Sequence, residues 1–340
     1  MKLYTIYLFL ICFGAVPVCS EILSIIAGSS LVASLGVGLG YIGWQKCFFD
    51  CCSEFKPIHE IETNLTILLS EKLYGQHIAV PALKNAIINH LKTKEPRKAL
   101  TLALHGITGT GKNYVASMIA KSMFTKGMSS RNVHVINGNR HFYDDKEIHD
   151  FKNGLTHWIQ GNLTSCSHSL FIFDEVDKLP SQVIDAIKPF IDHNIKITNA
   201  DPRRAIFMFL SNTGSEVISQ HALKYAQQGK ARESISFIEM QEIVEASAYN
   251  QGDGGLKNSE LIGKHLIDYF IPFLPLTRTH VLLCIRDYAK QESIFLTAEQ
   301  EEKIADGLTY FPRGGGNAGT FSSSGCKHVA NRVNLEKFQL

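Results

Sequence analysis

Short apolar runs alternate with amphipathic stretches along most of this chain. Three of the runs, at 99–106, 169–177 and 205–212, are strongly apolar and stop at glycine, acidic or amide residues. Such runs are typical of strands buried on both faces of a parallel sheet, and the stretches between them repeat with the period of a helix. The pattern predicts an α/β fold in which helices cover both faces of a parallel sheet. The same periodicity predicts helices over 58–72, 113–126, 145–160 and near 181–192, a turn followed by a helix over 73–91, and a strand over 133–136.

The pattern changes after the apolar segment 266–276. Helical periodicity returns over 279–291 and 297–308, a loop rich in glycine and serine occupies 314–324, and a last short helix follows. This change predicts a small helical domain beside the α/β domain. The predicted bounds of the two domains are 54–275 and 276–340.

The N-terminus has the order of a secretory signal peptide. Lys2 precedes an apolar run over 3–16, and small residues follow at 18–20, where a signal peptidase would cut. We therefore predict a signal peptide over 1–20. A buried N-terminal helix is the less favoured alternative.

A second apolar stretch follows directly. Residues 22–45 include no charged side chain, and a helix of about 20 residues is enough to cross a bilayer. The stretch is rich in glycine and ends near Trp44, a residue type enriched at membrane interfaces. We predict a membrane-associating segment over 21–46. Two topologies stay open, because spanning would put the following chain in the cytosol, whereas lying in one leaflet would keep it in the lumen.

The composition is that of an ordinary globular protein. Of 340 residues, 45 % are hydrophobic and 19 % are charged, and the formal net charge of +2 comes without a long basic run. We therefore expect no nucleic-acid partner. Asn64 and Asn162 begin N-x-[S/T] sequons, which fit a luminal glycoprotein although such tripeptides also arise by chance. Cysteine and histidine pairs at zinc-ligand spacing do not occur in the sequence.

The stretch "GITGTGKN", residues 106–113, follows the first strongly apolar run and opens a helical pattern. It matches the phosphate-binding loop G-x-x-x-x-G-K-[S/T] except at its last position, and in such loops backbone N–H groups and a helix N-terminus face a phosphate. Lys112 is expected to reach the β- and γ-phosphates. Asn113 replaces the hydroxyl residue, and its amide oxygen can ligate Mg²⁺ or accept a hydrogen bond from a metal-bound water. The predicted nucleotide-binding residues are Gly106, Ile107, Thr108, Gly109, Thr110, Gly111, Lys112 and Asn113.

Polar residues follow two later strands at the same edge of the predicted sheet. Asp174 and Glu175 come after one apolar run, and Asn212 ends the next one. We expect Asp174 to hold Mg²⁺, directly or through water, and Glu175 to polarise the attacking water. Asn212 would steady that water or the γ-phosphate. Each feature alone fits a plain turn or a solvated strand end, but three strand ends in this order predict a site for ATP and Mg²⁺.

Together these residues resemble the torsins, AAA+ ATPases of the endoplasmic reticulum and nuclear envelope lumen that are distantly similar to Clp-type unfoldases. The resemblance extends from about Glu54 to the C-terminus, and Asn after the loop lysine is the torsin form of this motif. It implies an AAA+ P-loop fold, ATPase activity, a luminal location and a chaperone-like remodelling role. The matching stretches are "GQ" (75–76), "GITGTGKN" (106–113), "FIFDEVDK" (171–178), "IKPFID" (187–192), "FLSN" (209–212), "LIDYFIPFLPL" (266–276) and "SGCKHV" (324–329).

The resemblance also implies roles for residues of the C-terminal part. Asn212 corresponds to the first sensor of AAA+ proteins and Lys327 to the second, which reaches the γ-phosphate from the helical domain. Cys284 and Cys326 correspond to the two cysteines that torsins pair. A disulfide between them would couple the luminal redox state to the nucleotide pocket, and the alternative is a pair of buried, reduced cysteines.

Two departures from the wider AAA+ pattern bear on activity. In Clp-type relatives an arginine precedes the residues that correspond to Ile267 and Asp268, where this chain has Leu266. An arginine finger is worth ~10³ to 10⁵ in rate, so we expect weak ATP hydrolysis by the protein alone. The segment 136–155 also lacks the Gly-aromatic-Val-Gly loop that grips substrate in a translocating pore.

The resemblance implies a source for the missing arginine. Torsins are activated by luminal domains of endoplasmic reticulum and inner nuclear membrane proteins, which supply an arginine in trans. We also expect self-association or a hetero-oligomer, and contact with the membrane surface through 21–46. Two other hypotheses stay open: a nucleotide-gated binding or scaffold protein with little hydrolysis, and a cytosolic AAA+ protein anchored by a membrane-spanning 22–45.

Overall fold

The computed structural model describes residues 54–139, 142, 144–193, 197–250, 255–312 and 319–337. The predicted signal peptide and membrane-associating segment lie outside these residues. Among the helices that are described, none combines the length and the apolar character needed to cross a membrane.

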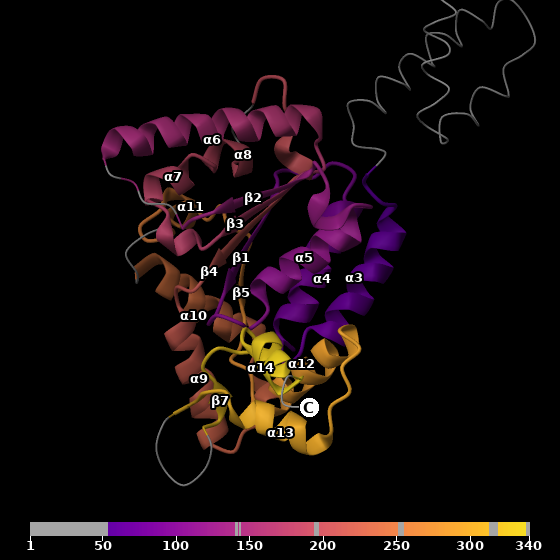
Figure 1. Ribbon diagram of the computed structural model, residues 1–340. Helices are drawn as coiled ribbons and strands as arrows, with labels where there is room; N and C mark the ends of the chain where they lie inside the picture. The colour runs from indigo at the N-terminus through magenta and orange to yellow at the C-terminus, as the bar shows by residue number, and fades with distance from the viewer. Residues whose placement is uncertain are drawn as a thin grey trace, which may run out of the picture. The chain divides into compact units, whose positions relative to one another are not determined.

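A five-stranded parallel sheet lies at the centre of the structure (Figure 1). Its strand order is β2-β3-β4-β1-β5, and each neighbouring pair is parallel, as predicted. Parallel strands need long crossover connections, which the helices supply. Because β1 pairs with β4 and β4 with β3, the carboxyl ends of these three strands lie side by side. The strands are β1 (Leu100–His105), β2 (Val133–Asn137), β3 (Leu170–Asp174), β4 (Ile206–Ser211) and β5 (Tyr269–Pro272).

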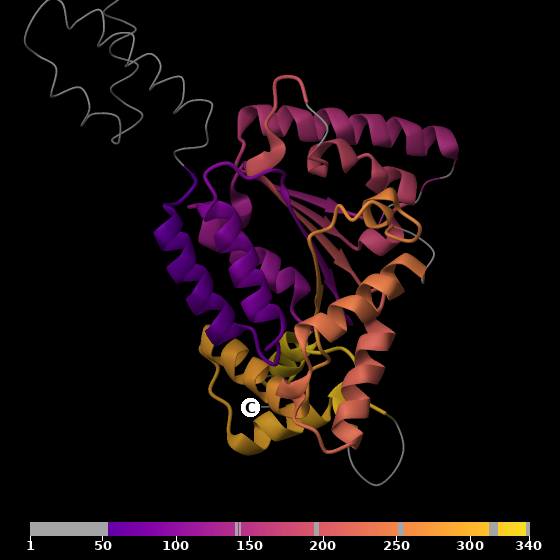
Figure 2. The same cartoon turned by 180° about the vertical axis from the view of Figure 1, so that it is seen from behind.

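The two faces of the sheet pack against different helices, as predicted (Figures 1 and 2). Successive strand residues point to opposite faces, so Leu102 and Met208 belong to one core while Ala103 and Phe207 belong to the other. Helices α3 to α5 bury the first face and helices α6 to α11 the second. The helices are α3 (Ile58–Lys72), α4 (Ala79–Lys92), α5 (Lys112–Met123), α6 (Asp145–Ser165), α7 (Ser181–Asp185), α8 (Lys188–Ile191), α9 (Ser215–Gln227), α10 (Phe237–Asn250) and α11 (Glu260–Gly263).

Some elements differ from the sequence prediction. The single helix expected near 181–192 is two short helices, α7 and α8. Pro189 lies in the first turn of α8, where its missing N–H is tolerated, but it cannot continue a helical hydrogen-bond ladder from α7. Helices α9 and α10 and strand β5 were not predicted. Strand β5 has only four residues and two prolines close to its end, so its periodicity is weak.

The C-terminal part is helical, as predicted, and has a hydrophobic cluster of its own. Residues of α12 (Arg278–Gln291), α13 (Ala298–Asp306) and α14 (Val329–Lys337) form this cluster. A small antiparallel pair, β6 (Tyr310–Phe311) with β7 (Phe321–Ser322), closes the region. The domain boundary at 275–276 stays a prediction, because 54–340 is a single compact unit.

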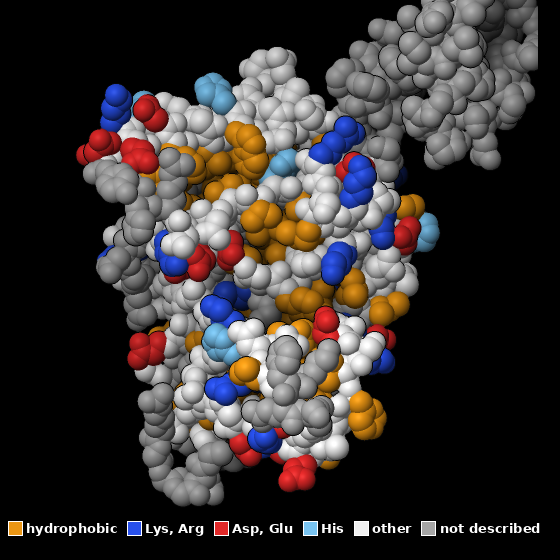
Figure 3. Space-filling view, in the orientation of Figure 1, with side chains coloured by type: hydrophobic (Ala, Val, Ile, Leu, Met, Phe, Trp, Pro, Cys, Tyr) orange, Lys and Arg blue, Asp and Glu red, His pale blue; other side chains and the backbone are white. Residues whose placement is uncertain are grey.

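Acidic and basic side chains are interspersed on the face of the molecule that Figure 3 shows. Apolar side chains are visible between them in small groups. On this face the charges of the described residues therefore do not add up to an extended field of one sign.

Candidate nucleotide-binding site

The predicted phosphate-binding loop connects the end of β1 to the start of α5. Gly109 and Gly111 have φ values of 82° and 110°, in the left-handed region that favours glycine. At Gly109 the close approach of a second loop adds to this requirement, because a Cβ there would lie 1.9 Å from the carbonyl oxygen of Ser324. Gly111 is the N-cap of α5, so the free N–H groups of this helix begin at Lys112. The sequence therefore builds the helix N-terminus that an anion site needs.

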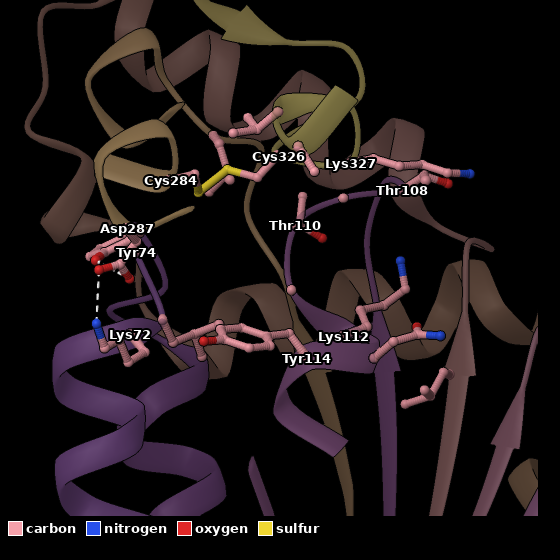
Figure 4. A pocket seen from close by; sticks show the side chains of 18 of the residues that line it. Lys72, Tyr74, Thr108, Thr110, Lys112, Tyr114, Cys284, Asp287, Cys326 and Lys327 are labelled. Carbon is pink, nitrogen blue, oxygen red and sulfur yellow. Dashed lines mark hydrogen bonds and ion pairs between the residues drawn. A yellow bond between two sulfur atoms is a disulfide. The ribbon is translucent and has the colours of Figure 1, made fainter. Parts of the chain in front are cut away.

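A cavity of ≈ 500 Å³ adjoins this loop (Figure 4). It extends from the carboxyl ends of β3 and β4 to α12, and Figure 4 shows side chains from both regions around it. Gly106 and Ile107 contribute to it through Lys112, which their carbonyl groups hold. The other predicted nucleotide, metal, catalytic and cysteine residues line it directly: Thr108, Gly109, Thr110, Gly111, Lys112, Asn113, Asp174, Glu175, Asn212, Cys284, Cys326 and Lys327.

Lys112 is the buried cation of the site, with 7 % of its surface exposed. Its ammonium donates to the carbonyl groups of Gly106 and Ile107 and to Oδ1 of Asn212, 3.1 Å away. Burial lowers the pKa of this ammonium to about 8, while the negative charges of Asp177 and Asp174 act against that shift. Lys112 thus joins the loop to the end of β4 and is mostly protonated at neutral pH.

Asn113 contacts the first of the two predicted acids. Its Nδ2 donates to Oδ2 of Asp174 at 2.7 Å. An ionised carboxylate only accepts hydrogen bonds, so the amide must turn its nitrogen toward Asp174 and its oxygen away from it. The amide oxygen of Asn113 and the carboxylate of Asp174 are both ligands that Mg²⁺ prefers. The donor types suit Mg²⁺, but the hydrogen bond turns the amide oxygen away from Asp174, so the metal role of the pair stays a prediction.

The residues present suit an ion that is held partly by the protein and partly by phosphate oxygens. Within the described residues, no group of three or more His, Cys, Asp and Glu side chains is placed to hold a metal ion. Mg²⁺ needs no such group, because it binds through one or two protein ligands together with phosphate oxygens and water.

Glu175 follows the end of β3 in the left-handed conformation, with φ 52°. Its Oε2 lies 2.8 Å from Nζ of Lys178, which hydrogen-bonds it in an ion pair that is partly open to solvent. The bond to Glu175 raises the pKa of Lys178. The carboxylate of Glu175 therefore lines the cavity with a defined partner.

Asp177 ties the end of β3 to the end of β4, a role that the sequence did not predict. Its Oδ1 accepts from the hydroxyl of Ser211 at 3.1 Å and from the backbone N–H of Asn212 at 3.0 Å. Asn212 is thereby fixed beside Lys112. The only sequence signal for Asp177 is its place in "DEVD" after the strand.

The second loop that meets the phosphate-binding loop contains Cys326 and Lys327. The backbone N–H of Cys326 donates to the carbonyl of Gly109 at 3.0 Å. Cys326 forms a disulfide with Cys284 of α12, with an S–S distance of 2.08 Å. The pairing expected from the resemblance is therefore present, and the alternative of two reduced cysteines is wrong for this structure. The exposed side chain of Lys327 extends beside Thr108 at the rim of the cavity (Figure 4).

At the end of the cavity near α12, sequence reasoning missed a polar cluster. Nζ of Lys72 lies 2.8 Å from Oδ1 of Asp287, and the hydroxyl of Tyr74 donates to Oδ2 of Asp287 at 2.7 Å. Burial, together with the bond to Asp287, raises the pKa of the Tyr74 hydroxyl. Asp287 lies 215 residues from Lys72 and 213 from Tyr74, and the three belong to no recognised motif, so no local signal could have joined them.

The two predicted sequons lie in helices. Asn64 is part of α3, and its side chain donates to Glu60 at 3.3 Å. Asn162 is part of α6, where its side chain donates to the carbonyl of Trp158 at 2.8 Å. Glycosylation of either residue stays a prediction.

Comparison with known proteins identifies the family of this chain. The family model described as Torsin matches residues 46–173. A protein from Caenorhabditis elegans described as "Torsin-like protein" is 36 % identical over 340 residues, covering 97 % of this chain and 94 % of that protein. The chain belongs to the torsin family.

Solved structures agree on the fold of this torsin. The S. cerevisiae Hsp104–ADP complex matches it with a TM-score of 0.55 and 18 % identity over 84 % of the torsin chain. Hsp104 in a closed state with ATPγS and FITC casein matches with a TM-score of 0.55 and 16 % identity over 83 % of it. The torsin chain covers 48 % and 47 % of these two chains, about half of their length. The likeness shows the AAA+ fold, and together with the family it makes the protein a torsin-like AAA+ ATPase.

The cationic side chains around the cavity of the torsin structure are lysines. The cavity is lined by Lys72, Lys112 and Lys327, and no arginine occurs among its described lining residues. Leu266 is 5 % exposed and precedes β5, which runs parallel to β1. Position 266 therefore lies at the amino-terminal edge of the sheet, opposite the phosphate-binding loop, and no side chain there could reach the site of its own chain. Another arginine of the chain could in principle serve in place of residue 266, and Arg232 is one candidate. Its guanidinium donates to the carbonyl groups of Gly75 and Pro275.

Proposed function

We propose that this torsin-family protein binds ATP with Mg²⁺ and hydrolyses it slowly unless a partner assists. The observation that carries the proposal is the meeting of three strand ends at one cavity. The loop after β1 brings Lys112, the end of β3 brings the acids Asp174 and Glu175, and the end of β4 brings Asn212. Such a set matches what phosphoryl transfer requires, namely positioning and charge stabilisation.

Each residue has a chemical task in this proposal. The loop N–H groups and Lys112 bind the β- and γ-phosphates, and Asp174 with the amide oxygen of Asn113 would hold Mg²⁺, which neutralises phosphate charge. Glu175 accepts a proton as water attacks the γ-phosphorus, while the bond from that phosphorus to the bridging oxygen of ADP breaks. Asn212 orients the water, and Lys327 stabilises the γ-phosphate from the rim.

The partner in this proposal supplies an arginine. The described lining of the cavity offers lysines for the phosphates but no guanidinium, and Leu266 faces the protein core. We infer that a luminal domain of an endoplasmic reticulum or inner nuclear membrane protein completes the site, within a self-associated or mixed oligomer that has a chaperone-like remodelling role. The family supports this location and activation, and the Cys284–Cys326 disulfide would report the luminal redox state to the nucleotide.

ATP binding and hydrolysis by the full-length chain in detergent test this function. Wild type should bind a fluorescent ATP analogue with Mg²⁺ and release phosphate slowly. Lys112→Ala should abolish binding, because it removes the buried cation. Lys121→Ala, which changes an exposed lysine of the same helix, is the matched control and should bind like wild type. Equal binding by Lys112→Ala and wild type would overturn the proposal.

The luminal location has its own test. Endoglycosidase treatment of protein expressed in cells should change its mobility, and Asn162→Gln should remove most of that change. A protein that endoglycosidase does not shift, and that protease added outside sealed microsomes degrades, would instead be cytosolic.

A nucleotide-gated binding protein is the second candidate function. The ion pair that engages Glu175 with Lys178 favours it, because a base held by a lysine is not free to take a proton. The two functions differ in one measurement. If a partner's luminal domain binds in the ATP state and turnover stays at background, the gated binding role is correct.

A further inference from the structure

A polar cluster fastens α12 to the end of α3 at the far side of the cavity. Asp287 is the centre of this cluster and accepts from Lys72 and Tyr74 through different oxygens, at 2.8 and 2.7 Å (Figure 4). The side chains of Lys72 and Asp287 keep only 32 % and 19 % of their exposure. Charge-assisted hydrogen bonds of partly buried groups are stronger than those on an open surface. We call Lys72, Tyr74 and Asp287 the α12 clamp.

The clamp residue Asp287 shares one stripe of α12 with the disulfide. Cys284, Asp287, Tyr288 and Gln291 all line the cavity, and their spacing of three, four and seven residues places them on one face of the helix. Cys284 lies one turn before Asp287. The same stripe therefore carries a covalent link on one turn and the clamp on the next.

From the disulfide the connection continues to the phosphate-binding loop. Cys326 donates its backbone N–H to the carbonyl of Gly109, and Lys327 is its neighbour in sequence. A carbon atom added at Gly325 would lie 2.2 Å from the carbonyl oxygen of Gly109, so the two loops are in close backbone contact. Any shift of α12 away from α3 would move the Lys327 loop, because the disulfide joins them.

We propose that Asp287 is a positioning residue that acts through Lys327: by clamping α12 to Lys72 and Tyr74, it holds Lys327 over the phosphate-binding loop and slows the release of ATP. The proposal rests on the nucleotide site proposed above. The bond to Asp287 also raises the pKa of Lys72, which keeps the lysine charged at neutral pH.

The rate of nucleotide release tests the clamp. A fluorescent ATP analogue bound with Mg²⁺ to the full-length chain in detergent is displaced by excess ATP, and Glu175→Gln in every variant prevents turnover. Asp287→Ala and Lys72→Met should each accelerate release by roughly ten- to hundredfold, the range expected for a lost hydrogen bond to a charged group. Tyr74→Phe should have a smaller effect, because it removes one hydroxyl and keeps the ring.

A double-variant comparison separates positioning from direct contact with nucleotide. If Asp287 acts through Lys327, Asp287→Ala should add nothing to the faster release of Lys327→Ala. The exchanged pair Lys72→Asp with Asp287→Lys should restore slow release, because it rebuilds the ion pair but not a direct contact. Additive effects, or no rescue in a variant with an unchanged melting temperature, would overturn the proposal.

A control variant on the same helix shows whether loss of any ion pair of α12 would accelerate release. Arg286 forms an ion pair with Glu301 at 2.7 Å and does not line the cavity. Arg286→Met should leave release unchanged. If wild type fails to bind the analogue, the proposed nucleotide site is wrong; if wild type binds and the clamp variants release at its rate, only the positioning role is wrong.

Discussion

The two ends of the cavity are built in different ways. At the phosphate end, Asp174 ends strand β3, while Lys112 and Asn212 come after β1 and β4, and the chain places them through local backbone geometry and the order of parallel strands. At the α12 end, Lys72 and Asp287 are 215 residues apart and meet only because two helices pack together. The difference teaches that local sequence places the residues with proposed chemical roles, whereas the proposed clamp depends on tertiary packing.

The largest expected effect is on ATP turnover at the phosphate end, which should depend on an arginine from outside the chain. Adding a partner's luminal domain that contributes an arginine should raise turnover by about 10³ to 10⁵, because a guanidinium neutralises charge that develops on the γ-phosphate. Phosphate release with and without the partner measures this gain. Changing the partner's arginine to alanine should remove the gain without dissolving the complex, and rapid turnover by the isolated chain would contradict it.

The next largest effect concerns Glu175, which adjoins the proposed Mg²⁺ ligand Asp174. Glu175→Gln should reduce partner-stimulated turnover by roughly 10² to 10⁴, since the amide cannot accept the proton of water. ATP affinity should change little, and the variant should hold its activator more tightly in the ATP state. Glu216→Gln, at an exposed position of α9, is the matched control. Normal turnover by Glu175→Gln would show that another group serves as the base.

A substitution at position 266 tests whether an arginine there could act in the site of its own chain. Leu266→Arg should lower the free energy of unfolding by about 2 to 4 kcal/mol, because it forces a guanidinium into the hydrophobic core. It should not raise turnover by the isolated chain. Thermal unfolding measures the stability, and Leu335→Arg on the exposed surface of α14 should change it little. A stable Leu266→Arg protein with fast turnover would contradict the assigned position.

A smaller effect should appear in the pH dependence of ATP binding. The pKa of Lys112 is about 8, and only its protonated form attracts the phosphates. Affinity should therefore be steady below pH 8 and fall above it by up to about tenfold per pH unit, as the lysine loses its proton. Titration with the fluorescent analogue between pH 6 and 10 measures this. Lys112→Arg keeps its charge over the range, and its affinity should not fall in the same way.

Much of the α/β architecture followed from periodicity. The strands predicted within 99–106, 169–177 and 205–212 and the helices that cover them are present, because short apolar runs bounded by turn residues suit strands that are buried on both faces. The helices α9 and α10 and the strand β5 were missed. Strand β5 has only four residues, so packing against the rest of the fold selects its conformation. Helices α9 and α10 have 13 and 14 residues, and their helical pattern was overlooked.

The sequence by itself determined the phosphate-binding loop, the acids after β3 and the amide after β4, since each depends on neighbouring residues and on the fixed direction of parallel strands. Only the tertiary structure decided that Asp177 fixes Asn212 and that Leu266 lies at the opposite edge of the sheet. It also brought Lys72 to Asp287. Contacts of that kind depend on how helices pack and on which charges the packing buries, and neither quantity is encoded in any short stretch of the chain.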